Sequence, residues 1–267
     1  MKVDIVTVTP DVALEWLTAN THNRHLSKIA VAKIVEDIGA GRWKDNGETV
    51  KFSKTGVLLD GQHRLTAIYM AGVTVRLMVV TGLEDDVQPT IDIGMARTAG
   101  SLLSMNGIAQ GNAVAALAKM VIRYDECPGV VWGSHNDPTK TEIVEYALEH
   151  QEDLSFAVIL TQGVRRAVKI NALSYAGMTY LVHRDSRHLR RWDTWSDGVR
   201  KGEDLSKGDP RLAYRNYHLK RLHQAWGGWE TQSMLGMALK AWNAYVLNKD
   251  LAFMRFAQSE LPMPKVR

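Results

Sequence analysis

The stretch that most constrains the fold spans residues 56–68, where an apolar run, an Asp-Gly pair and a helical pattern follow one another. Residues 56–59 are typical of a short strand, which breaks at Asp60-Gly61, and apolar residues resume at helical spacing from Leu65. A strand that turns through glycine into a helix leaves the first N–H groups of the helix without intrahelical partners, at the positive end of the helix dipole. The order of elements therefore predicts an anion-binding position at this turn.

Polar side chains crowd the same turn. Arg64 offers a bidentate contact for a phosphate, and His63 offers a further contact. Asp60 could cap the turn, hold a metal or accept a proton from a substrate hydroxyl. The alternative is a common Asp-Gly turn followed by polar side chains that only face water.

Residues 60–65, with the sequence Asp-Gly-Gln-His-Arg-Leu, resemble the phosphate-binding motif of the ParB/sulfiredoxin superfamily. That motif is Gly-Glu-Arg-Arg in the partition proteins, Gly-Cys-His-Arg in sulfiredoxin and Asp-Gly-His-Thr-Arg in the free-serine kinases of the same fold. Upstream, Asn23-Arg24 and the helical stretch after it resemble the family's first box, and downstream Arg97 resembles the arginine of its third box. The resemblance covers residues 20–105.

The resemblance implies two sets of site residues. The expected nucleotide or phosphate contacts are Gly61, Gln62, His63, Arg64, Arg97, Asn23 and Arg24. The expected catalytic residues are Asp60 and His63. The implied ligand is a nucleoside triphosphate or diphosphate, with or without Mg²⁺.

The departures from the family limit what the resemblance implies. Gln62 stands where sulfiredoxin has its nucleophilic cysteine, so repair of cysteine-sulfinic acid is excluded. The glutamate of the partition proteins also falls on Gln62, which removes a charge that could order a metal or a water. Ile93 and Gly94 stand where the third box has Glu and Asn, and Asp92 is the nearby acidic candidate for a metal ligand.

The secondary-structure pattern changes along the chain. We expect strands at residues 4–8, 49–53, 57–59 and 73–82, in a compact ParB/sulfiredoxin-like α/β domain with a small mixed sheet over residues 1–105. Between the strands, Thr9-Pro10 predicts the start of a helix at residues 10–17, and Ser27 predicts the N-cap of the next helix. Beyond Gly107 the pattern is nearly all helical, which predicts an all-helical domain over residues 106–267 and an α+β fold class for the chain. The expected helices of this half are residues 112–124, 139–150, 154–160, 170–184, 211–226 and 232–248, and Thr139 with Glu142 has the pattern of a capping box. Phage-encoded proteins that pair an Asp-Gly-Gln-His-Arg domain with a helical half are similar through residues 241–243.

Basic charge is concentrated in residues 164–223, which hold 14 Lys and Arg against 6 Asp and Glu, a net charge of +8. Such a segment attracts phosphate backbones. Arginines interleave with tryptophans in it, so the arginines could bind a sugar-phosphate chain while an indole stacks on a base. The candidate nucleic-acid contacts are Arg184, Arg187, Arg190, Arg191, Trp192 and Trp195. The alternative places both tryptophans in the core with the arginines solvated around them.

The remaining composition narrows the class of protein. Cys127 is the only cysteine, so the sequence contains neither a disulfide framework nor a cysteine-based zinc cluster. No stretch approaches the roughly 20 apolar residues that span a bilayer, and we expect a cytoplasmic protein without a membrane partner. Serine-hydrolase and P-loop signatures are absent.

These observations support several hypotheses about function. The first is a ParB-like protein that binds a nucleotide, DNA or both, through residues 60–65 and the basic helical half. The second is a kinase-like enzyme of the same fold, a phosphotransferase or nucleotide hydrolase, that acts on a small molecule or a nucleic-acid component. A ParB-like nuclease and a non-catalytic interaction module rank lower, and a homodimer is compatible with each of these hypotheses.

Overall fold

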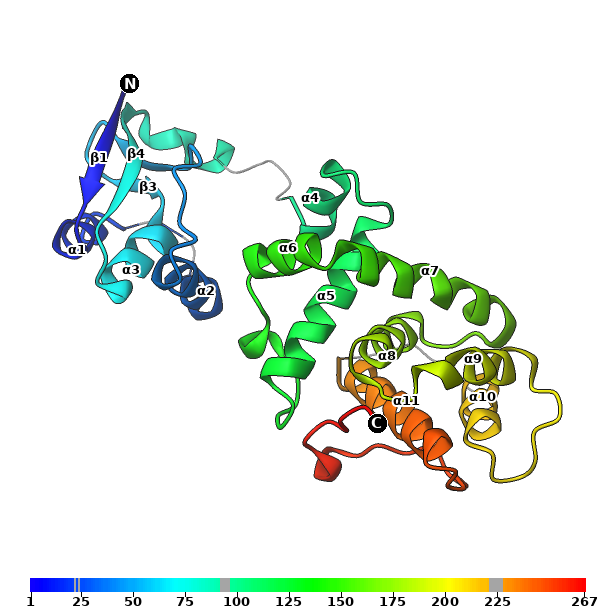
Figure 1. Ribbon diagram of the computed structural model, residues 1–267. Helices are drawn as coiled ribbons and strands as arrows, with labels where there is room; N and C mark the ends of the chain where they lie inside the picture. The colour runs from blue at the N-terminus through cyan, green and yellow to red at the C-terminus, as the bar shows by residue number, and fades with distance from the viewer. Residues whose placement is uncertain (22, 24, 92–96, 221–227) are drawn as a thin grey trace. The chain divides into compact units, whose positions relative to one another are not determined.

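The computed structural model describes residues 1–21, 23, 25–91, 97–220 and 228–267, and the chain divides into two compact units, Met1–Ala96 and Arg97–Arg267 (Figure 1). The boundary lies earlier than the predicted one at residue 105. It does so because α4 (Ala99–Met105) packs on the helices that follow it, so that it belongs to the helical unit.

The N-terminal unit is built on a four-stranded mixed sheet with the order β1-β4-β2-β3. Its strands are β1 (Lys2–Val8), β2 (Thr49–Ser53), β3 (Leu58–Asp60) and β4 (Val75–Leu83). β4 pairs antiparallel with β1 and parallel with β2, and β2 pairs antiparallel with β3. The sequence pattern predicted this small mixed sheet beside helices, and the structure confirms it, although the ParB-like identity of the unit stays a prediction.

Three helices pack against the sheet and bury its core residues. They are α1 (Pro10–Leu17), α2 (Lys28–Gly39) and α3 (Gln62–Ala71), and a 3₁₀ helix, η1 (Asp85–Thr90), follows β4. Two of these helices begin at residues that favour helix starts. The Thr9 hydroxyl accepts a hydrogen bond from the Val12 N–H at 3.3 Å, and the Ser27 hydroxyl accepts one from the Ala30 N–H at 3.3 Å.

The core of this unit lies between the sheet and its helices. Leu65 and Ile68 of α3 are fully buried there, together with Val8 of β1 and Val50 of β2. The alternation along β1 leaves the other side of that strand in water, where Ile5 is 62% exposed. The glycine turn after β3 is therefore held between a buried strand and a buried helix face.

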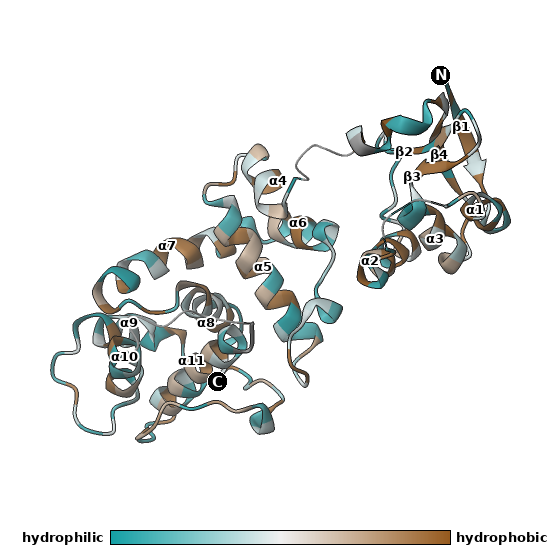
Figure 2. Cartoon of the chain, turned by 180° about the vertical axis from the view of Figure 1, so that it is seen from behind, coloured by the Kyte–Doolittle hydropathy of each residue, from teal (hydrophilic) through white to brown (hydrophobic). Residues whose placement is uncertain are grey.

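The second unit contains helices and no strand in the part that the structure describes. Its α-helices are α4 (Ala99–Met105), α5 (Gly111–Glu126), α6 (Lys140–Glu149), α7 (Gln151–Val168), α8 (Ala172–Asp185), α9 (Trp192–Lys201), α10 (Pro210–Lys220) and α11 (Gly228–Val246). Short 3₁₀ helices lie at η2 (Ser134–Asn136), η3 (Leu189–Arg191) and η4 (Gln258–Glu260). Helices of both units are amphipathic (Figure 2), as is typical of helices that each bury one face.

The helix α8 is largely buried and packs against α5, α7 and α11. Tyr175, Met178 and Leu181 of α8 are fully buried, and Trp242 of α11 is buried beside them. The whole middle of α8 is covered, so its sequence reads as nearly continuous apolar and small residues.

Several predicted elements are confirmed with their bounds. The helix at residues 10–17 and the strand at 49–53 match α1 and β2, and Thr139 forms the predicted capping box with Glu142 at the start of α6. The helix predicted at residues 154–160 is longer in the structure, where α7 spans Gln151–Val168. The helices α4 and α9 were not predicted.

Candidate functional site

The turn between β3 and α3 requires glycine. Gly61 has φ +105° and ψ 4°, a conformation that residues with a side chain rarely adopt. A Cβ at this position would lie 2.9 Å from Val50 Cγ2 and 3.2 Å from Val50 Cα, both in the neighbouring strand. Gly61 is the N-cap residue of α3 and no side chain caps the helix, so the positive end of its dipole faces the space in front of the turn.

That space is a cavity of about 770 Å³. Its walls come from the glycine turn, the start of α2, the segment before α2 and the end of η1. The residues that line it are Asn23, His25, Ser27, Ala30, Ile34, Leu59, Asp60, Gly61, Gln62, His63, Arg64, Gln88 and Ile91. A volume of this size is in the range of sites for nucleotides and other small molecules.

Gln62 is buried and supports the loops around the turn. Its Oε1 accepts a hydrogen bond from Asn20 Nδ2 at 3.0 Å. Asn23 Nδ2 in turn donates to Asn20 Oδ1 at 2.7 Å and to the Leu58 carbonyl at 2.6 Å, and Gln88 Nε2 donates to Asn23 Oδ1 at 3.1 Å. The sequence predicted Gln62 and Asn23 as ligand contacts, and this stays a prediction. Both residues line the cavity, and their side chains join β3, η1 and the segment after α1.

Arg64 is also held by the protein rather than presented alone to a ligand. Its NH2 lies 3.0 Å from Glu48 Oε2 and 3.8 Å from Asp60 Oδ2, and its NH1 donates to the Thr49 carbonyl. Lys51 Nζ lies 2.6 Å from the same Asp60 oxygen. Two cations and two carboxylates therefore balance in this cluster. The guanidinium is 16% exposed, whereas the Glu48 side chain is 60% exposed, so Glu48 is the partner that water or a ligand can most easily replace.

The two predicted catalytic residues are likewise engaged. His63 Nε2 accepts a hydrogen bond from the Ser27 N–H at 3.0 Å, which uses the lone pair through which that nitrogen would take a proton. The Asp60 carboxylate is 14% exposed and lies against Lys51. In this arrangement both side chains shape the turn, and neither is placed as a general base through these atoms.

Three predicted contacts lie elsewhere. Arg24 and Asp92 fall outside the described residues. Arg97 belongs to the helical unit, where its carbonyl accepts a hydrogen bond from Lys140 Nζ at 3.5 Å. Among the described residues no group of three or more His, Cys, Asp or Glu side chains is arranged to hold a metal ion.

Sequence reasoning missed the residues that close the cavity opposite the glycine turn. His25 precedes α2, Ser27 is the N-cap residue of α2, Ala30 lies in its first turn, and Gln88 comes from η1. Ser27 was predicted as a helix N-cap, which located the start of α2. It gave no indication that the Ser27 N–H donates to His63 of the glycine turn. Gln88 carried no signal, because only the tertiary fold brings it to the Leu59 carbonyl, 3.3 Å from its Nε2.

The tryptophans of the basic segment are core residues. Trp192 is 5% exposed and Trp195 is 0% exposed, and both pack with Trp242 at ring-centroid distances of 5.8 Å. The prediction that they stack on nucleic-acid bases is therefore wrong for this structure, and the alternative core placement is what the structure has.

Several arginines of the segment are tied to the protein as well. Arg184 forms a bidentate pair with Asp125 at 2.7 and 2.8 Å, and the hydrogen bonds to this carboxylate raise the pKa of the Arg184 guanidinium. Arg191 donates to the Val246 carbonyl at 2.9 Å and lies 4.2 Å from the ring centroid of Tyr245. Both residues hold helices together, and their role as nucleic-acid contacts stays a prediction.

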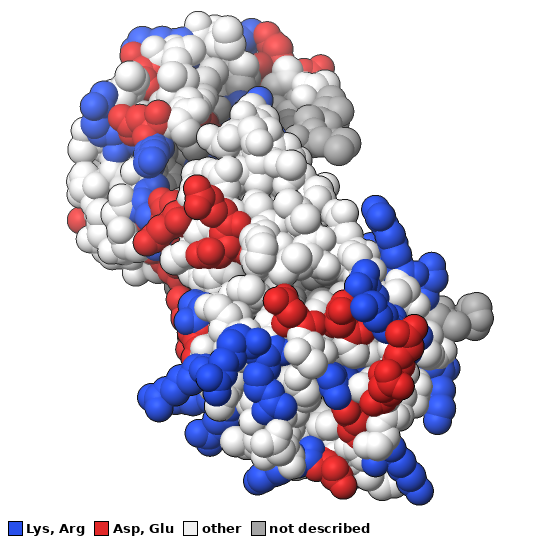
Figure 3. All heavy atoms as spheres, turned by 45° about the vertical axis from the view of Figure 1, so that its right-hand side comes forward, with Lys and Arg blue, Asp and Glu red and all other residues white. Residues whose placement is uncertain are grey.

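Arg187 and Arg190 are exposed and form no ion pair with any described residue. Elsewhere in the segment acids neutralise the bases: Asp197 pairs with Arg200 and Lys201 at 2.7 and 2.9 Å. Hydrogen bonds from Lys201 and then Arg200 hold the pKa of Asp197 below its usual value. Figure 3 shows Asp and Glu side chains lying between the Lys and Arg side chains of one face.

Comparison with protein-family models, curated proteins and solved structures gives no match to this chain. The helices of the described residues include none whose length and apolar character would let it cross a membrane.

Proposed function

We propose that the N-terminal unit binds a phosphate-bearing small molecule, of the nucleotide class, in the cavity at the start of α3. One observation carries this proposal. The φ of +105° at Gly61 turns an uncapped helix start toward a cavity of about 770 Å³, where the helix dipole favours an anion. The resemblance of residues 60–65 to a phosphate-binding motif agrees with it.

Arg64 contributes its positive charge to this site: a ligand phosphate would replace Glu48 as the partner of its guanidinium. The Glu48 side chain is the most exposed member of the cluster, and a phosphate can accept two parallel hydrogen bonds from the guanidinium in its place. The Gln62 network and the hydrogen bond from Ser27 to His63 keep the turn in place before the ligand arrives. This preorganisation lowers the entropy lost on binding.

Ligand binding is the function that this geometry favours over phosphotransfer. A transfer reaction needs a group that takes the proton of the acceptor, and Asp60 faces Lys51 while His63 Nε2 already accepts a hydrogen bond. Asp60 is also poorly suited to hold Mg²⁺, because an ammonium group lies 2.6 Å from its Oδ2. Nucleic-acid contact by the helical unit rests on Arg187 and Arg190 and is secondary in this proposal.

The test is a calorimetric titration of the full chain with ATP, CTP, GTP and ADP, each with and without Mg²⁺. Ala30→Tyr places a phenol ring in the cavity, and Ala32→Tyr is the matched control, because Ala32 is exposed on the same helix and does not line the cavity. We expect saturable binding of at least one nucleotide, lost in Ala30→Tyr and retained in Ala32→Tyr. Binding that survives Ala30→Tyr, or no binding to the wild type, would overturn the proposal.

A further inference from the structure

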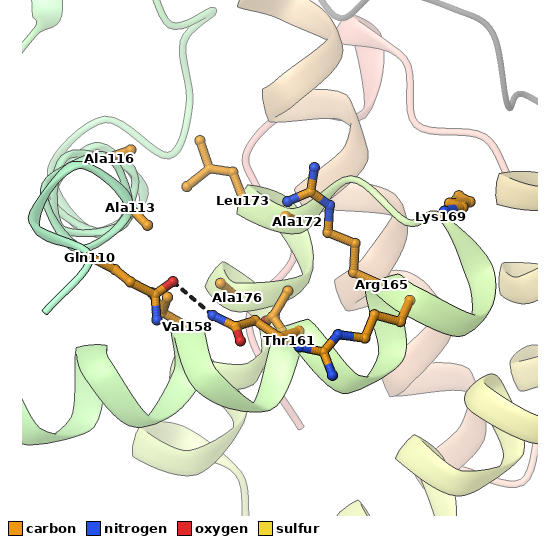
Figure 4. Close-up of a pocket in the computed structure, with 12 residues that line it drawn as sticks. Gln110, Ala113, Ala116, Val158, Thr161, Arg165, Lys169, Ala172, Leu173 and Ala176 are labelled. Carbon is orange, nitrogen blue, oxygen red and sulfur yellow. Dashed lines mark hydrogen bonds between the residues drawn. The ribbon is translucent and has the colours of Figure 1, made fainter.

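A second cavity, of about 550 Å³, lies within the helical unit between α5, α7 and the start of α8 (Figure 4). Small side chains make this hollow. Ala113 and Ala116 come from α5, and Ala172 and Ala176 come from α8. Together with the side chains of Val158, Thr161 and Leu173 they form a largely apolar wall.

Three cations border the cavity at the end of α7: Arg165, Arg166 and Lys169. None of the residues that line the cavity is acidic. None of the three cations has a carboxylate within 4.0 Å in the part of the chain that the structure describes. They differ in this from Arg184 and Arg211, whose charges are matched by aspartates.

The start of α8 also borders the cavity, through its first two residues, Ala172 and Leu173. Its positive dipole end offsets the negative end of α7, where the three cations stand, so the side-chain charges set the sign of this end of the cavity. On the other side of the cavity, Gln162 Nε2 donates to Gln110 Oε1 at 2.8 Å, which fixes two side-chain amides at its edge (Figure 4). The cavity therefore has a cationic end, an apolar wall and a polar edge.

We propose that this cavity binds a small organic anion, with its carboxylate, sulfonate or phosphate group at the three cations and an apolar or aromatic body against the alanine-rich wall. A concave site of this volume suits a small molecule, and unpaired cations beside apolar side chains select a ligand that combines both properties. The site lies in the helical unit and does not depend on the cavity at Gly61.

The probes for the test are 1-anilinonaphthalene-8-sulfonate and N-phenyl-1-naphthylamine, which share an aromatic body and differ by the sulfonate. Fluorescence titrations of the full chain would compare the wild type with two variants. The first carries Arg165→Gln, Arg166→Gln and Lys169→Gln; the second carries Ala113→Phe, which fills the hollow from an exposed position. The controls replace exposed residues outside the cavity: Lys207→Gln, Lys249→Gln and Arg255→Gln together, and Ala252→Phe. Circular dichroism would verify that each variant is folded.

We expect the wild type to bind the sulfonate probe at least about tenfold more tightly than the neutral probe, which corresponds to about 1.4 kcal/mol. The triple cavity variant should lose this preference, Ala113→Phe should weaken both probes, and the controls should behave as wild type. A preference that survives the triple cavity variant, or that the control triple also loses, would overturn the proposal. Displacement of the probe by a single-stranded oligonucleotide but not by benzoate would overturn it too, because it would assign the cations to a nucleic-acid backbone.

Discussion

Replacement of Gly61 by alanine should destabilise the N-terminal unit by two separable effects. The backbone at φ +105° disfavours a side chain by about 1–2 kcal/mol. The new Cβ would also lie 2.9 Å from Val50 Cγ2 and 3.2 Å from its Cα, and overpacking of this kind costs about 1–3 kcal/mol. The free energy of unfolding of the unit should therefore fall by about 2–5 kcal/mol.

Gly72→Ala is the matched control for this prediction. Gly72 ends α3 at φ +66°, and a Cβ there would meet no atom within 4 Å. It therefore carries the backbone strain without the clash, and its effect should stay at about 1–2 kcal/mol. The difference between the two variants measures how tightly the turn is packed on β2.

Hydrogen exchange followed by mass spectrometry is the suitable assay, because it reports the opening free energy of each unit of the full chain separately. Slowly exchanging amides of β4 and α3 should lose protection in Gly61→Ala by more than in Gly72→Ala. Amides of α8 in the helical unit should be unchanged and serve as an internal reference. Equal effects of the two glycine variants would refute the reasoning, because they would show that Val50 does not constrain the turn.

Three further predictions concern charge. Glu48→Gln should tighten nucleotide binding by up to about fivefold, since it releases an exposed partner of Arg64; calorimetry showing unchanged or weaker binding would contradict this. If the helical unit binds DNA, Arg187→Glu with Arg190→Glu should reduce the slope of log affinity against log salt by about 2, whereas Lys207→Glu with Lys249→Glu should not; equal slopes in all variants would remove these arginines from the interface. Burial lowers the pKa of His183, so protonation favours the unfolded state and the helical unit should lose stability as pH falls below about 6.5; His183→Gln should flatten this dependence in pH-resolved denaturation, and an unchanged profile would assign it to other groups.

Local chemistry in the sequence was enough to place many elements. Thr9-Pro10, Ser27 and Thr139 mark helix starts that the structure confirms, because a capping hydroxyl needs only the N–H groups a few residues ahead of it. The strand–glycine–helix order at residues 56–68 is likewise local. Its turn is found where the Asp-Gly pair predicted it.

Helices whose ends carry no such capping or turn residues were harder to predict. The apolar spacing located only the middle of α7, whose last turns carry Arg165 and Arg166 at the surface. The helix α9 was not predicted although its sequence carries a helical signal: Trp192, Trp195 and Val199 are three and four residues apart and lie on one buried face. Tertiary packing decided the bounds of α7.

The sequence by itself determined that the chain has a small sheet followed by helices, and that a glycine turn opens α3, because these features depend on residues close together in the chain. Only the tertiary structure decided what the polar residues near that turn do. Gln62 bonds to Asn20, which is far from it in sequence, and Arg64 bonds to Glu48. In the same way, the sequence pattern of a tryptophan among arginines is the same whether the indole stacks on a base or packs in the core. The packing of buried Trp195 against Trp242 and Tyr245 shows that it is a core residue. The partner of a side chain is set by segments that the fold brings together, and a single sequence does not encode that proximity in any local pattern.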